Sequence, residues 1–130
     1  MIYALDTNII IDFFRLEPNV IKKRNEAVLA RIHFVIPPIV DYEIRRGFYK
    51  FPKEHIEIYQ DLARNCHVGE MTPSVMRQSM DVWANLRRKG FTVGDADIFI
   101  AAFCIVNDYV LITNDKDFVN IENLNIIDWN

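Results

Sequence analysis

Short apolar runs alternate with longer segments of helical hydrophobic spacing along this chain, and this alternation most constrains its fold. The expected strands cover residues 2–5, 33–36, 66–68, 110–113 and 125–127. The expected helices cover residues 8–15, 20–30, 38–49, 53–64, 73–89 and 94–107. Strands that alternate with helices form a mainly parallel sheet covered on both faces, so the pattern predicts an α/β fold.

The composition is that of an ordinary globular protein, with 51% hydrophobic and 25% charged residues over 130 positions. No repeat, linker or low-complexity tract divides the chain, which predicts a single domain over residues 1–130. The net charge of −3 argues weakly against a general polyanion binder and leaves room for local basic patches. Asp6 interrupts any apolar leader, and no apolar run approaches about 18 residues, so we expect a cytosolic protein without a membrane span.

Two of the expected helices have distinctive hydrophobic patterns. The helix over 73–89 has apolar residues at helical spacing on one predicted face, which we expect in the core: Val75, Met76, Met80, Trp83 and Leu86. The helix over 94–107 is apolar on nearly every side, which predicts that it is buried.

Four acidic residues occupy positions that suggest a shared site. Asp6 directly follows the first expected strand, and Asp115 lies two residues beyond the strand that ends at Thr113. The carboxyl ends of parallel strands meet at one edge of a sheet, so both acids should lie at that edge. Asp97 falls in the first turn of the most apolar helix, and Glu43 lies within a mostly apolar helical segment.

Each of these acids also has an ordinary structural interpretation. Asp97 could interact with the dipole of its helix, Asp6 could be a turn residue, and Glu43 and Asp115 could be solvated. A shared divalent cation accounts for all four together, because inward-facing carboxylates need a partner and Mg²⁺ prefers oxygen ligands. The sequence analysis therefore predicts a metal site and leaves the solvated alternatives open.

Further acids lie close to these four in the sequence. Asp95 could support the site or add a ligand, although an N-terminal helix cap after Gly94 is an equal alternative. Asp117 and Asp12 are expected to be solvated or capping residues, and Asp41 an exposed helix acid.

Four segments, in this order, resemble the PIN-domain family and more closely its VapC-type toxins. They are MIYALDTN at 1–8, DYEIRRGFY at 41–49, VGDADIFIAAFCIVND at 93–108 and LITNDKDF at 111–118. The resemblance implies the PIN fold, with a mainly parallel sheet of four to five strands flanked by helices. It also implies that the catalytic acids are Asp6, Glu43, Asp97 and Asp115, with Asp97 rather than Asp95 as the third.

The same resemblance implies a Mg²⁺- or Mn²⁺-dependent endoribonuclease that is inhibited by a VapB-like antitoxin and forms a homodimer. The stretch YEIRRG is most similar to VapC members that cut initiator tRNA, the tRNA(fMet)-specific group, in the anticodon region. Water activated by the metal should leave a 5′-phosphate and a 3′-hydroxyl. His33, His55 and His67 show no pairing typical of a metal-independent ribonuclease.

Polar and basic residues near the four acids are candidates for supporting roles. Thr7, Asn8, Thr113 and Asn114 could hydrogen-bond a carboxylate or a phosphate, and helix or turn capping is the competing interpretation. Phosphate contacts could come from basic residues, whose alternative is an ordinary solvated surface: Arg45, Arg46, Arg87, Arg88, Lys89 and Lys116.

Two other functions compete with the nuclease hypothesis. The chain could be a catalytically inactive PIN-like module that binds RNA or a protein, although the presence of all four acids argues against this. A phosphotransfer domain also places acids at strand ends, but the phosphatase pattern DxDxT is missing, because Thr7 and Asn8 follow Asp6.

Overall fold

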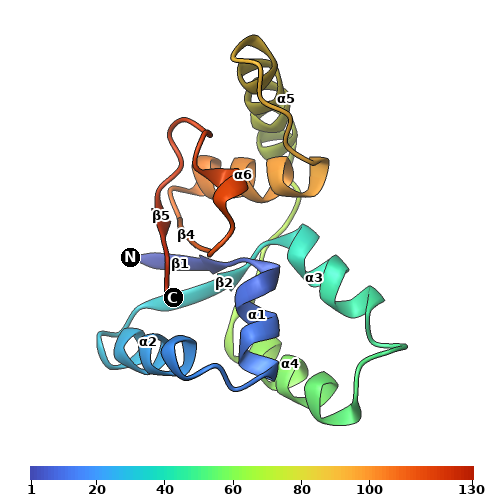
Figure 1. The fold of residues 1–130 in the computed structure, drawn as a ribbon, viewed down its shortest axis with the longest axis vertical. Helices are drawn as coiled ribbons and strands as arrows, with labels where there is room; N and C mark the ends of the chain where they lie inside the picture. Colours follow the sequence, from blue (N-terminus) through green and yellow to red (C-terminus); the bar gives the residue numbers. More distant parts are fainter.

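A five-stranded parallel sheet, flanked by helices, forms the centre of the molecule in the computed structural model, which describes residues 1–130 (Figure 1). The strands are β1 (Ile2–Leu5), β2 (His33–Ile36), β3 (His67–Val68), β4 (Val110–Ile112) and β5 (Ile126–Ile127). Their order across the sheet is β3-β2-β1-β4-β5, and every neighbouring pair is parallel. The predicted α/β fold and strand number are therefore confirmed.

The helices follow the predicted order, with ends shifted by a few residues. They are α1 (Thr7–Phe14), α2 (Pro18–Leu29), α3 (Pro38–Arg46), α4 (Lys53–Asn65), α5 (Pro73–Arg88) and α6 (Asp95–Asn107), and a short 3₁₀ helix, η1, covers Lys116–Phe118. The largest difference concerns α3, which ends at Arg46 instead of continuing to Tyr49. Gly47 follows it, and the ring of Phe51 fills the space that a side chain at position 47 would occupy.

The core lies between the central strands and the helices that cover them. Ala4 of β1 pairs with Val35 of β2 on one side and with Leu111 of β4 on the other, and all three are buried. Helix α6 contributes buried residues on most of its circumference, as predicted: Ile98, Ile100, Ala101, Ala102, Phe103 and Cys104. None of the helices combines the length and apolar character needed to cross a membrane.

The predicted apolar face of α5 is confirmed for Val75 and Leu86, which are buried, and wrong for Met76, Met80 and Trp83. The residues of α5 that are buried are Val75, Ser79, Val82 and Leu86. Met76, Met80 and Trp83 are 45%, 64% and 45% exposed, respectively. Two stripes of suitable spacing run along this helix, and tertiary packing buries the one that contains Val82. The other stripe remains an exposed apolar surface.

Candidate metal centre

Asp6 lies directly after β1, at the middle of the carboxyl edge of the sheet, and is only 4% exposed. Its Oδ1 accepts a hydrogen bond of 2.8 Å from the Thr7 amide, so Asp6, and not Thr7 or Asn8, caps α1. Its Oδ2 accepts a hydrogen bond of 2.7 Å from the Thr113 hydroxyl. Donors from two separate segments therefore fix the orientation of this buried carboxylate.

Two threonine hydroxyls connect Asp6 to the neighbouring acids. The Thr7 hydroxyl donates to Oε1 of Glu43 at 2.9 Å, which ties α1 to α3. The Thr113 hydroxyl, besides donating to Asp6, accepts a hydrogen bond of 3.0 Å from the Asp115 amide. Thr7 and Thr113 thus contact site carboxylates, as one of the two sequence interpretations predicted.

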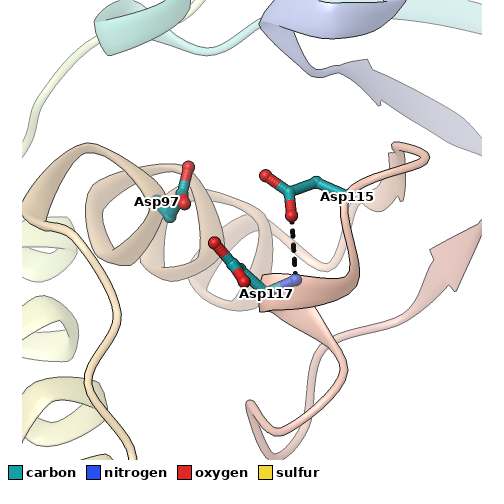
Figure 2. Close-up of side chains that lie close together, drawn as sticks. All are labelled: Asp97, Asp115 and Asp117. Atoms are coloured by element: carbon teal, nitrogen blue, oxygen red, sulfur yellow. Dashed lines mark hydrogen bonds between the residues drawn. The ribbon is translucent and has the colours of Figure 1, made fainter.

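The tightest group of carboxylates combines Asp97 of α6 with Asp115 and Asp117 of the β4–η1 segment (Figure 2). One carboxylate oxygen from each lies within 4.8 Å of the other two. The Asp117 amide donates to Oδ1 of Asp115 at 2.9 Å, which holds the two residues in a tight turn. The sequence pattern predicts that Asp117 is a solvated or capping residue. It is exposed, but it belongs to the cluster, and the Asp-x-Asp spacing at the start of η1 was the available signal.

The acids from the different elements repel one another. The pKa of Asp6 is raised above its ordinary value chiefly by burial and also by Asp115 and Glu43, although the donors Thr113 and Thr7 oppose the shift. The pKa of Asp97 is raised from 3.8 to about 6, first by burial and then by the charges of its neighbours, with Asp6 the foremost of them. Asp6 and Asp97 are therefore electrostatic neighbours, as the predicted site requires.

This set of side chains fits a divalent cation. All the atoms that could bind a metal here are carboxylate or hydroxyl oxygens, which hard cations prefer as ligands. Among the ion pairs of the structure, only that between Arg46 and Glu43, at 4.0 Å, involves one of the four predicted acids. A cation near Asp97 and Asp115 would offset charges that no basic side chain neutralises.

The remaining polar candidates lie further from the cluster. Asn8 is exposed and makes no side-chain hydrogen bond within the chain. Asn114 is also exposed, and its amide donates to Oδ2 of Asp12 at 3.4 Å. Asp95 is exposed and lines a hollow together with Met80 and Trp83 of α5. It does not belong to the group formed by Asp97, Asp115 and Asp117.

The two arginines of α3 point in different directions. The Arg45 Nε donates to Oδ1 of Asp41 at 2.8 Å, and the same oxygen accepts a hydrogen bond of 2.7 Å from the buried Tyr59. Arg45 is therefore committed to the contact between α3 and α4. Arg46 instead reaches Glu43, so of this pair only Arg46 lies beside the acids.

The other basic candidates lie on α5 and η1. The Arg87 guanidinium lies 5.0 Å from the ring centroid of Trp83, and Lys89 forms an ion pair with Glu122. Arg88 lines a hollow beside the C-terminal segment. Lys116 is exposed, lies between Asp115 and Asp117 in the sequence, and forms no ion pair within the chain.

The sequence model of the PIN-domain family matches residues 3–124 of this chain. The fold and the acidic edge of the sheet described above agree with this match. The chain belongs to the PIN-domain family. Within the family it groups with the VapC proteins, since it is 30% identical to Ribonuclease VapC1 of Haemophilus influenzae strain R2866 over 99% of this chain and 98% of that one.

Solved structures give the same grouping. The toxin-antitoxin structure VapBC-1 from nontypeable Haemophilus influenzae is matched with a TM-score of 0.84 and 30% identity, over 99% of this chain and 98% of that chain. VapBC2 from Rickettsia felis, bound to a promoter DNA fragment, is matched with a TM-score of 0.89 and 24% identity over both full chains. At that lower identity the second likeness concerns the fold.

Proposed function

We propose that this protein is a metal-dependent endoribonuclease and the toxin of a toxin–antitoxin pair. The observation that carries the proposal is the meeting of Asp6, Glu43, Asp97 and Asp115 at the carboxyl edge of the sheet. They come from four different elements, and two threonine hydroxyls hold three of them in a fixed arrangement. The names of the VapC relatives, which are ribonucleases, support the same activity.

In this proposal Asp6 and Asp97 are the principal ligands of Mg²⁺ or Mn²⁺, and Glu43 and Asp115 bind it directly or through water. A divalent cation held there would activate water as a nucleophile near neutral pH and offset negative charge on the scissile phosphate. Thr7 and Thr113 keep the carboxylates oriented through the hydrogen bonds described above. Hydrolysis of this kind leaves a 5′-phosphate and a 3′-hydroxyl.

The proposed substrate is a structured RNA, and tRNA is the first class to examine. The similarity of YEIRRG, residues 42–47, to tRNA(fMet)-cutting members makes the anticodon region of initiator tRNA the first substrate to test. We also propose that residues 1–130 act as a single PIN domain and that the protein works in the cytoplasm, where tRNA is found.

The test is cleavage of initiator tRNA and of an unrelated structured RNA in Mg²⁺, in Mn²⁺ and in EDTA. We expect cleavage only with a metal, and we expect Asp6→Asn and Asp97→Asn to abolish it. Asp81→Asn is the matched control, because Asp81 is exposed on α5 and lies outside the acidic cluster. Products with a 2′,3′-cyclic phosphate, or cleavage that persists in EDTA, would contradict the proposal.

The antitoxin partner is proposed to bind an apolar groove between α1, α2 and α4. It has a volume of ≈ 400 Å³ and is lined by Phe13, Leu16, Ile21, Ile58 and Leu62, with Arg24, Asp61 and Asn65 beside them. An amphipathic helix is the usual occupant of such a groove. The similarity to chains solved as VapBC complexes supports this partner.

We further propose that the protein is a homodimer and that the exposed stripe of α5 is the contact surface. A hollow of ≈ 480 Å³ is lined by Met76, Met80 and Trp83 of this stripe and by Asp95. With Arg87 stacked on Trp83, the patch carries both charge signs, which a self-complementary interface can pair. Light scattering should give a dimer mass for the wild type and a monomer mass for Met80→Lys. A wild-type monomer would refute this assembly.

A further inference from the structure

Helix α3 presents three different faces, and only one of them is directed toward the acids. Val40 and Ile44 are buried in the core. Asp41 and Arg45 form the hydrogen-bonded contact with α4 through Tyr59. The third face is centred on Arg46, which lies one helical turn after both Tyr42 (i,i+4) and Glu43 (i,i+3), and its outer part is open to solvent.

Arg46 lies between a site carboxylate and an exposed aromatic ring. Its Nη2 is 4.0 Å from Oε2 of Glu43, and its Cζ is 5.2 Å from the centroid of the Tyr42 ring. The Tyr42 residue is 56% exposed, and the Arg46 side chain is 60% exposed. Since Glu43 is hydrogen-bonded to Thr7, next to Asp6, the ring is separated from the central acids by only a few contacts.

We propose that Tyr42 and Arg46 bind an unpaired nucleotide beside the scissile phosphate, with its base stacked on the Tyr42 ring and its phosphate at the Arg46 guanidinium. This inference rests on the proposed function and makes it more specific. Tyr42 determines specificity, because a base can stack on its ring only where the RNA is single-stranded, as in a loop or a bulge.

Arg46 and the exposed ring of Tyr42 provide the two kinds of contact that a nucleotide makes, one with its phosphate and one with its base. Any phosphodiester that reaches Asp6 and Asp97 approaches a group of carboxylates that repel one another. Arg46 is the basic residue paired with one of the four acids, so it compensates a phosphate next to the scissile one. One side of the Tyr42 ring is covered by Arg46, and the exposed part of the ring remains available to a base.

The experiment compares RNA affinity and base stacking in Tyr42→Ala, Tyr42→Trp and Tyr49→Ala. Tyr49 is the matched control, because this tyrosine lies just beyond the end of α3 and is 87% exposed. It has no aromatic or cation–π partner. Two RNA probes are compared. The first is a hairpin with 2-aminopurine in its unpaired loop, and the second is the same RNA annealed to its complement, in which that base is paired. Binding is followed by anisotropy in EDTA, so that no cleavage occurs, and stacking by quenching of the 2-aminopurine fluorescence.

We expect Tyr42→Ala to weaken binding of the hairpin by about 5- to 100-fold and to remove the quenching. Tyr42→Trp should retain both, Tyr49→Ala should match the wild type, and the paired RNA should bind all variants alike. Equal affinity and quenching in Tyr42→Ala and Tyr49→Ala would overturn the inference, as would equal weakening of the hairpin and the paired RNA. Loss of antitoxin binding in Tyr42→Ala with unchanged RNA binding would also overturn it.

The cleavage assay separates this inference from the proposed function. If the wild type cleaves RNA with metal and Tyr42 has no effect on binding or quenching, only the inference fails. If the Tyr42 pattern is found but neither Mg²⁺ nor Mn²⁺ supports cleavage, only the nuclease proposal fails.

Discussion

Replacing Thr113 by valine should destabilise the protein through Asp6, although the two side chains have nearly the same shape. The Thr113 hydroxyl is buried and makes two hydrogen bonds, donating to Asp6 at 2.7 Å and accepting from the Asp115 amide at 3.0 Å. A hydrogen bond to a charged group contributes about 1.5–3 kcal/mol, and a neutral one about 0.5–1.5 kcal/mol. Because water can replace part of the second bond, we expect a loss of about 2–3 kcal/mol.

Urea and thermal unfolding of the metal-free protein at about pH 8 measure this loss. At about 4 °C per kcal/mol for a domain of this size, the melting temperature should fall by roughly 10 °C. Thr113→Ser is the matched control, since it keeps the hydroxyl and removes one buried methyl group, at about 1 kcal/mol. Cleavage of RNA should survive in Thr113→Ser and be strongly reduced in Thr113→Val.

The pH dependence gives an independent check. The hydrogen bond from Thr113 lowers the pKa of Asp6 against the larger effect of burial, so its removal raises that pKa further. Below the folded pKa the protonated carboxyl group no longer needs the donor, and the difference between the Val and Ser variants should shrink toward acid pH. Equal stability of the two variants at about pH 8 would refute the reasoning, since ionised Asp6 would then not depend on Thr113.

Three further predictions concern the metal centre and the antitoxin groove. Because the pKa of Asp97 is raised from 3.8 to about 6, the metal-free protein should lose stability as the pH rises from about 4 to about 6. Asp97→Asn should then be more stable than the wild type in EDTA near neutral pH, by roughly 1–2 kcal/mol after allowance for solvent screening, and urea unfolding in which it is less stable would contradict this. Asp117→Asn should weaken Mg²⁺ binding severalfold in calorimetry, whereas unchanged affinity would place Asp117 outside the metal centre. Leu16→Asp should impair antitoxin binding, because Leu16 is 68% exposed and lines the groove. Cleavage should be retained, because aspartate tolerates the positive φ of this position. Unaltered antitoxin binding in a pull-down would exclude this part of the groove.

The local pattern of the sequence was sufficient for the elements and for two of the site acids. Strands and helices were predictable because their hydrophobic periods differ, and α6 was predictably buried because it is apolar all round. Asp6 and Asp115 could be assigned to one edge because they follow parallel strands, whose carboxyl ends coincide. Glu43 and Asp97 were candidates because they fall in apolar helical segments, where a solvated role remained an alternative, and the resemblance to the PIN family implied their catalytic role.

Only the tertiary structure decided between alternatives that look equal in the sequence. Along α5, the stripe with Val82 and the stripe with Met80 both have helical spacing, and tertiary packing determines which one is buried. Arg45 and Arg46 are adjacent, but the 100° step of a helix directs one toward Tyr59 and the other toward Glu43. Likewise, Asp117 joins Asp97 because η1 packs against α6. The sequence specified which segments fold and which residues carry charge, whereas the direction of each side chain depended on long-range packing that no local pattern encodes.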